Sequence, residues 1–158
     1  MLNRLLARHA PLGPLALRLA LGAVFLAHAY AKAFVYTLPG TVQFFAASGF
    51  PGWTAYPVFA AELLGGLALI VGFRTREVAV LLIPVMLGAL KTHAGNGWMF
   101  TSAGGGWEYV AFLIGALGAQ AFVGAGAFAL DTAAARATTS HGPADTAAPR
   151  PPRDRVLV

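Results

Sequence analysis

Four long apolar stretches, separated by short polar segments, limit the folds that are open to this chain. They cover residues 15–35, 54–73, 77–93 and 107–128. Each has close to the ~20 residues that an α-helix needs to cross a hydrocarbon core ~30 Å thick. Only 11% of the residues are charged and 58% are hydrophobic, whereas a soluble domain carries roughly twice as many charges. The sequence therefore predicts an all-α membrane protein, built as a four-transmembrane-helix bundle.

Basic residues are distributed unevenly around these stretches. The segments 36–53 and 94–106 contain no Lys or Arg, whereas the chain ends and the second loop contain Arg4, Arg8, Arg74, Arg76, Arg136, Arg150, Arg153 and Arg155. Positive loops stay in the cytoplasm, so we expect both termini to be cytoplasmic. We expect a basic N-terminus (1–14), one membrane domain (15–131) and a disordered tail (132–158).

Composition also excludes several classes of function. The formal charge of +5 follows the topology pattern and therefore does not indicate nucleic-acid binding. There is no cysteine, which excludes disulfides, iron–sulfur ligation and dithiol chemistry in this chain. Ala29-Tyr30-Ala31 could end a cleavable signal peptide, but residues 15–35 are long enough to span, so we expect this segment to be retained.

Five ionisable side chains lie in or at the ends of the apolar stretches, and the predicted topology places them near one face. His28, Lys32 and Lys91 are near the outer ends of stretches one and three, which run outward. Glu62 lies about two helical turns below the outer surface, and Glu108 lies near that surface. At about 5.4 Å per turn, all five fit within a slab ~10–12 Å thick.

These charges allow two interpretations. Lys32 and Lys91 balance Glu62 and Glu108, and removing one partner of a buried pair costs ~3–5 kcal/mol. The pairs could therefore only fix the packing of the helices. Intramembrane charges also line substrate and proton pathways, in which Glu62 would carry a proton. His28 could transfer protons as well, or remain neutral with one hydrogen bond.

The polar slab is a candidate site for a flat lipophilic ring. The aromatic residues of segment 36–53 predict an interfacial or partly re-entrant segment, either anchoring the protein or covering the slab. A quinone head would find hydrogen-bond donors in Lys32, Lys91, His28 and Trp107. Haem between two histidines is disfavoured because charged neighbours would crowd the porphyrin. The lysines also disfavour a cation, so no metal site is predicted.

Other residues predict how the helices pack. We expect Arg18 to extend its guanidinium toward the cytoplasmic surface. Gly65 and Gly66 should allow close approach between helices, and Pro84 should kink the third helix. His93 is about 200° around a helix from Lys91, so both cannot face the same interior, and we assign His93 to the loop.

The order and spacing of several short motifs resemble the DoxX family of small bacterial membrane proteins. The motifs are His28-Ala29-Tyr30-Ala31-Lys32, Gly49-Phe50-Pro51, Glu62-Leu63-Leu64-Gly65-Gly66, Gly105-Gly106-Trp107-Glu108-Tyr109 and Leu130-Asp131. The family often has Gly where this chain has Ala29, a difference that affects packing more than chemistry. The resemblance implies a four-helix protein of the bacterial inner membrane, associated with oxidoreductases. The family's name comes from a subunit of a quinone-linked oxidase.

The leading hypothesis is a membrane subunit that binds a quinone-like ring and serves a soluble or membrane-bound redox partner. Glu62 would carry a proton, Lys32 and Lys91 would donate to ring carbonyls, and Glu108 would be their counter-charge. Catalysis by this chain alone is not expected, because it lacks a flavin motif and a metal site. The alternatives are a non-catalytic scaffold that recruits a redox or detoxification enzyme and a small proton-coupled carrier. A homo-oligomer is compatible with each.

Overall fold

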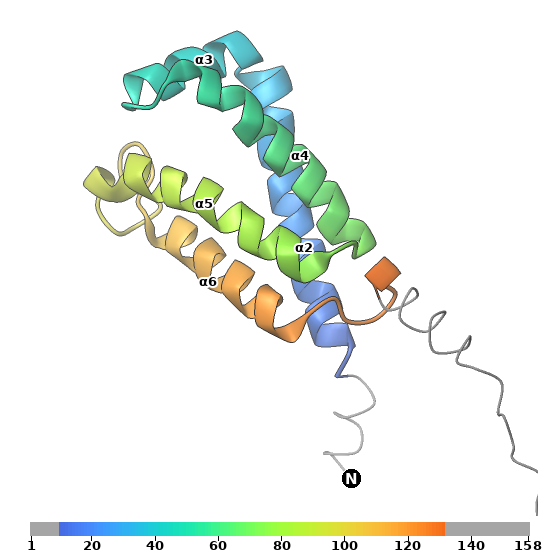
Figure 1. The fold of residues 1–158 in the computed structure, drawn as a ribbon. Helices are drawn as coiled ribbons and strands as arrows, with labels where there is room; N and C mark the ends of the chain where they lie inside the picture. The colour runs from blue at the N-terminus through green and yellow to red at the C-terminus, as the bar shows by residue number, and fades with distance from the viewer. Residues whose placement is uncertain (1–9, 132–158) are drawn as a thin grey trace, which may run out of the picture.

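The computed structural model describes residues 10–131, and all regular structure in this range is helical (Figure 1). The elements are α2 (Leu12–Tyr30), the π-helical segment η1 (Ala31–Val35), α3 (Leu38–Ala47), the 3₁₀ turn η2 (Gly52–Thr54), α4 (Ala55–Val71), α5 (Thr75–His93), the 3₁₀ turn η3 (Ala94–Asn96) and α6 (Glu108–Val123). The predicted all-α class is confirmed for this range. Most of the predicted N-terminal segment (1–14) and the predicted tail (132–158) lie outside the described residues.

Three of the helical segments are long and apolar enough to cross a membrane: Leu12–Val35, Gly52–Val71 and Thr75–Asn96. They correspond to the first three predicted stretches. α6 is shorter than the predicted stretch 107–128, because the chain leaves the helix at Gly124 with a left-handed φ of 82°. Its 16 residues span about 24 Å, at about 1.5 Å per residue. The structure therefore shows three full-length candidate spans and one shorter apolar helix.

The helices pack in two pairs, α2 with α4 and α5 with α6. α2 and α4 approach closely at glycines, since a Cβ added to Gly22 would lie 2.9 Å from the carbonyl oxygen of Gly66. Gly65 faces the other pair, where its added Cβ would lie 3.0 Å from Leu82 of α5. The two adjacent glycines thus contact two different helices, and they join the two pairs around one apolar core.

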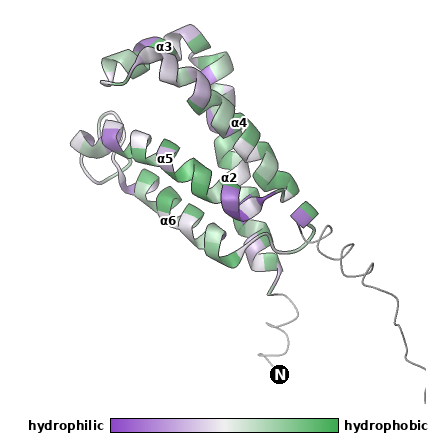
Figure 2. Cartoon of the chain, viewed as in Figure 1, coloured by the Kyte–Doolittle hydropathy of each residue, from purple (hydrophilic) through white to green (hydrophobic). Residues whose placement is uncertain are grey.

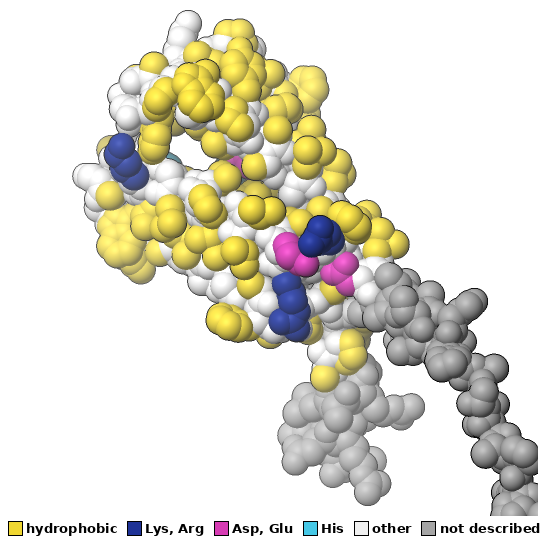
Figure 3. Space-filling view, viewed as in Figure 1, with side chains coloured by type: hydrophobic (Ala, Val, Ile, Leu, Met, Phe, Trp, Pro, Cys, Tyr) yellow, Lys and Arg dark blue, Asp and Glu magenta, His cyan; other side chains and the backbone are white. Residues whose placement is uncertain are grey.

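One end of the molecule is closed by hydrogen bonds between Asp131 and the α4–α5 turn. Asp131 accepts hydrogen bonds from the backbone N–H groups of Arg74 and Thr75 at 2.7 and 2.9 Å, and so caps α5. Its own N–H donates to the carbonyl of Gly72 at 3.0 Å. The residues after α6 therefore fold back onto the α4–α5 turn (Figure 1). Figure 2 shows hydrophilic residues at this turn, and Figure 3 shows acidic and basic side chains clustered there.

Arg18 corrects a prediction from the sequence. Its side chain does not extend toward the surface but is buried, with 1% of the residue exposed. The guanidinium donates to the backbone carbonyls of Leu69 and Ile70 in α4 and of Ala125 and Ala127 after α6. The prediction was wrong because it assumed that only water could accept hydrogen bonds from the guanidinium. The end of α4 and the irregular segment after α6 both leave carbonyls without helical partners.

Candidate functional site

A cavity of about 910 Å³ lies at the opposite end, where the two helix pairs diverge. Its walls come from all five α-helices and from the loop that precedes α6. Figure 3 shows the molecule hollowed between the α3 region and the loop end of α5 and α6. This volume falls within the range of ~300–1,000 Å³ that is common for small-molecule sites.

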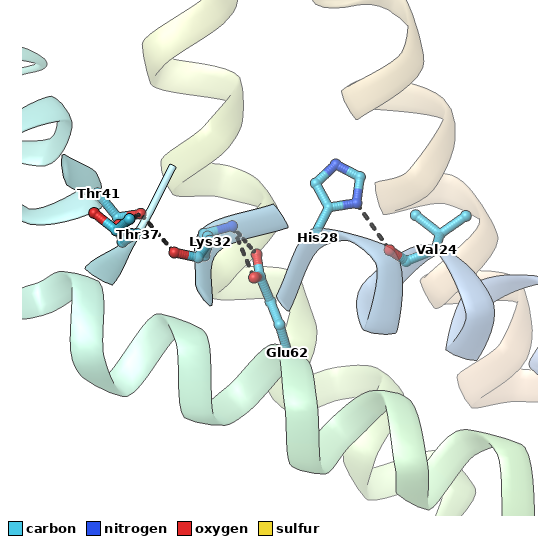
Figure 4. Close-up of polar contacts among 6 residues, drawn as sticks. All are labelled: Val24, His28, Lys32, Thr37, Thr41 and Glu62. Atoms are coloured by element: carbon cyan, nitrogen blue, oxygen red, sulfur yellow. Dashed lines mark hydrogen bonds and ion pairs between the residues drawn. The ribbon is translucent and has the colours of Figure 1, made fainter. Parts of the chain in front are cut away.

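A buried ion pair forms part of the cavity wall. Nζ of Lys32 lies 2.7 Å from each carboxylate oxygen of Glu62 (Figure 4). The Glu62 side chain is 3% exposed and the Lys32 side chain is 15% exposed. The structure thus joins two of the residues that the sequence placed at one depth. A charge pair beside an open cavity provides a polar contact for a bound molecule in an otherwise apolar site.

A π-helical turn places Lys32. The N–H of Tyr36 donates to the carbonyl of Ala31 at 2.9 Å, a five-residue spacing that widens the helix and changes its register. The buried Thr41 hydroxyl lies 2.9 Å from the carbonyl of Thr37 and 3.4 Å from that of Lys32. Apolar periodicity alone predicted a regular helix here. One sequence feature could have indicated that a new helix begins here, because the N-cap residue Thr37 is followed two positions later by Pro39.

Two histidines line the cavity, one from each helix pair. Nδ1 of His28 lies 2.8 Å from the carbonyl of Val24, and Nδ1 of His93 lies 2.9 Å from the carbonyl of Gly105. Because a carbonyl only accepts hydrogen bonds, each Nδ1 carries a proton and donates it. These contacts fix the orientation of both rings.

His93 corrects the assignment on α5. It is the last residue of the helix rather than part of the loop, and it lines the cavity. Lys91 lies outside the cavity lining, and its Nζ is 4.5 Å from the ring centroid of Phe50. The predicted angular separation of the two residues stands, but His93 is the one that faces inward. The buried residues Leu82 and Met86 lie on the same helical stripe as His93.

Glu108 and Trp107 lie apart from the cavity. The Glu108 carboxylate accepts a hydrogen bond from the backbone N–H of Phe100 at 2.9 Å, and among residues 10–131 it forms no ion pair with Lys91. Trp107 packs edge-on against Trp98, with ring centroids 4.4 Å apart. Both side chains therefore stabilise the loop before α6. The sequence predicted both residues as part of the ring site but could not show that they contact the loop before α6 instead.

The aromatic residues of the outer segments are divided between two environments. Phe44, Phe45, Phe50 and Phe100 line the cavity, and ring contacts connect Phe45 to both Phe44 and Phe50. Trp53 and Trp98 do not line the cavity, and both are exposed, as are Phe44 and Phe100. The predicted interfacial segment 36–53 contains the helix α3, which supplies Phe44 and Phe45. Among the described residues, no group of three or more His, Cys, Asp and Glu side chains could hold a metal ion.

A family model and a curated relative match this chain. A family model described as DoxX matches residues 13–95, which include His28, Lys32, Glu62 and His93. A relative from Bacillus subtilis (strain 168), named "Putative oxidoreductase CatD", is 38% identical over 81 residues. That match covers 51% of this chain and 59% of the relative, so the chain spans less than two thirds of the relative's length. No solved structure matches the chain.

Proposed function

This chain belongs to the DoxX family of membrane proteins, and from that premise we propose that it is an integral membrane subunit of a quinone-linked oxidoreductase system. It binds a quinone-like lipophilic ring in the cavity at the α3 end of the bundle. The observation that carries the proposal is the Lys32–Glu62 ion pair, which is buried in the wall of an aromatic-lined cavity. The name of the Bacillus relative supports an oxidoreductase role.

The ion pair favours a ligand-binding site over a purely structural contact between helices, because not all of its hydrogen-bond donors are used. An ammonium group has three N–H donors, and Glu62 occupies two of them at most. An ionisable group at membrane depth costs at least ~2.5–3.5 kcal/mol by insertion scales. The Lys32 ammonium, which has an unused N–H donor, therefore needs a further hydrogen-bond acceptor. A bound ring with polar substituents supplies that partner, and the phenylalanines contact its apolar faces.

The structure changes the roles assigned to individual residues. Lys32 remains the donor to the ring, and Glu62 and His28 remain the groups that hold or transfer a proton. Lys91, Trp107 and Glu108 do not line the cavity and are not part of this proposal. His93 takes the position that had been assigned to Lys91.

The proposal includes a topology in the bacterial inner membrane. α2 with η1, α4, α5 and the shorter α6 each cross the bilayer, and the α4–α5 turn faces the cytoplasm. The cavity then lies in the outer half of the membrane. The basic residues at the α4–α5 turn and their absence from the segments 36–53 and 94–106 support this orientation.

The topology can be tested with single cysteines, because the natural chain has none. Thr101→Cys lies in the exposed loop before α6, and Glu77→Cys lies on the exposed start of α5. An impermeant maleimide should label Thr101→Cys in intact cells and Glu77→Cys only after permeabilisation. The reverse result would place the cavity in the cytoplasmic half.

The bound molecule can be identified by mass spectrometry of the organic extract from protein purified in mild detergent. The decisive variant is Gly88→Leu, since Gly88 lines the cavity and an added Cβ would meet only Phe50, at 3.9 Å. Gly115→Leu on α6 is the matched control, because a Cβ there meets nothing within 4 Å. We expect near-stoichiometric quinone in the wild type and the control, and its loss from Gly88→Leu.

A wild-type extract without quinone, but with other lipids retained, would contradict the binding proposal. The chain would then be better described as a scaffold that recruits a redox or detoxification enzyme, with the ion pair serving assembly. Equal quinone content in folded Gly88→Leu and Gly115→Leu would place the ring elsewhere on the protein.

A further inference from the structure

A second hollow, a groove of about 630 Å³, lies at the start of α6. Its walls are formed by Trp98 and Phe100 of the preceding loop and by Glu108, Tyr109 and Phe112 of α6. Phe100 and Tyr109 also line the ring cavity, so the two hollows adjoin at these side chains. The other three residues have no part in the proposed ring site.

The aromatic side chains of the groove are open to their surroundings rather than packed inside the bundle. All four are exposed, from 43% for Tyr109 to 68% for Phe112. Exposed Trp and Tyr commonly anchor a protein at the membrane interface, and this exposure alone requires no ligand. The charge that lies among the rings is the feature that points to one.

Glu108 places a negative charge in the wall of the groove. The carboxylate accepts a hydrogen bond from the backbone N–H of Phe100 at 2.9 Å, but it forms no ion pair within residues 10–131. The segment 94–106 contains no Lys or Arg that could supply a counter-charge. Glu108 begins α6, where the helix dipole contributes about half a positive charge. A full negative charge is therefore only partly compensated, and the groove favours a cation.

A carboxylate beside exposed aromatic rings suits an organic ammonium group. The faces of aromatic rings carry negative potential and attract such cations, and the carboxylate can accept a charge-assisted hydrogen bond. A hard metal ion is a poorer match, because it takes several oxygen ligands whereas the groove offers one carboxylate.

The order of side chains along α6 fits the ammonium group of a phospholipid. Phe112 lies four residues beyond Glu108, which is about 6 Å further along the apolar helix. The charged part of the groove thus lies at the start of α6 and an apolar part lies one turn deeper, in the order of a headgroup and its acyl chains. The indole N–H of Trp98 and the hydroxyl of Tyr109 can donate hydrogen bonds to a phosphate.

We propose that this groove binds a phospholipid with an amine headgroup, of the phosphatidylethanolamine class. The ammonium group contacts the Glu108 carboxylate and the aromatic rings, and an acyl chain lies against Phe112. The proposal requires α6 to lie in the bilayer with Glu108 at headgroup depth. It does not depend on ring binding in the larger cavity.

The test is native mass spectrometry of the full-length protein in detergent, titrated with phosphatidylethanolamine or phosphatidylglycerol that carry the same acyl chains. The dissociation constant for the amine lipid should be lower by about tenfold, the effect of one hydrogen bond to a charged group. Glu108→Gln keeps an acceptor oxygen for the N–H of Phe100 and should abolish the preference. Glu77→Gln is the matched control, because Glu77 is an exposed carboxylate at the opposite end, and it should preserve the preference.

Two further measurements separate the headgroup from the acyl chain. Phe112→Ala should weaken the binding of both lipids alike, because it removes an apolar contact that they share. Glycerophosphoethanolamine, which is the headgroup without acyl chains, should not displace the amine lipid at equal concentration. Displacement at equal concentration would overturn the lipid as the ligand and leave a soluble ammonium compound in its place.

The proposal would be overturned by equal affinity of the wild type for the two lipids. A preference for the amine lipid that persists unchanged in folded Glu108→Gln would overturn it as well. In either case the aromatic side chains of the groove only anchor the protein at the interface. Neither result affects ring binding, which the quinone content of the purified protein tests separately.

Discussion

Two regions of this molecule bury ionisable side chains in apolar helices, and they use them differently. At one end, Arg18 is 1% exposed and donates to four backbone carbonyls. At the other end, Glu62 is 2% exposed, and its charged partner is Lys32. Burial is the same in both regions, whereas the number of hydrogen bonds is not.

This difference is the basis for our proposal of a structural role at one end and a binding role at the other. A guanidinium has five N–H donors, and four interactions of Arg18 join the end of α4 to the segment after α6. Little capacity remains there for a ligand. The Lys32–Glu62 pair lies beside an open cavity, and Glu62 occupies at most two of the three N–H donors of Lys32. The open cavity beside the pair, rather than burial, therefore identifies the candidate site.

The largest effect on stability is expected from Arg18→Met. The substitution removes the guanidinium from four carbonyls, of which that of Leu69 also accepts from the N–H of Gly72. With the other three left unsatisfied at about 1–3 kcal/mol each, the total is on the order of 3 kcal/mol or more. Thermal unfolding followed by circular dichroism in detergent measures it. Arg76→Met is the control, because Arg76 is exposed and donates to one carbonyl, that of Ala121. Equal stability of the two variants would contradict the structural role of Arg18.

The second comparison removes either the Lys32 charge alone or the charges of both Lys32 and Glu62. Lys32→Met leaves the Glu62 carboxylate buried without its counter-charge and should cost about 3 kcal/mol of unfolding free energy. Lys32→Met with Glu62→Gln should recover most of that loss, because no net charge remains buried. The same thermal measurement applies, together with ring content by mass spectrometry. Recovery of stability without recovery of ring content is the expected result. A double variant that retained the ring would make the pair merely structural.

A smaller effect is expected at the closed end from Asp131→Ala. The carboxylate caps α5 through the N–H groups of Arg74 and Thr75, and loss of such a cap typically costs about 1–2 kcal/mol. Ring content per folded molecule should not change, because this end is remote from the cavity lining. Asp131→Asn keeps one acceptor oxygen and should be intermediate. Loss of the ring at unchanged stability would show that the two ends are coupled.

The smallest effect is expected from Lys91→Ala. The substitution removes a cation–π contact with Phe50 at an exposed position, which is worth about 0.5–1 kcal/mol. Melting temperature and ring content should both remain close to wild type. A loss of ring content as large as that of Gly88→Leu would return Lys91 to the binding site.

Part of the candidate site was predictable from the sequence because it depends on distance along single helices. The positions of Lys32 and Glu62 within their apolar stretches placed both at one depth, and the structure pairs them. The same reasoning failed between Lys91 and Glu108, because depth does not specify the direction in which a side chain points. The rotation of α5 about its axis directs His93 into the cavity and Lys91 away from it.

The sequence by itself determined the helical class, the three long apolar helices and the family, because membrane solvation and short motifs act through local composition and spacing. The tertiary structure alone decided where Arg18 finds its partners, where α6 ends and how the π turn at Ala31–Val35 orients Lys32. Each of these depends on carbonyls or packing surfaces from segments distant in the chain. Periodicity within one helix contains no information about such partners, since they come together only when the two helix pairs pack.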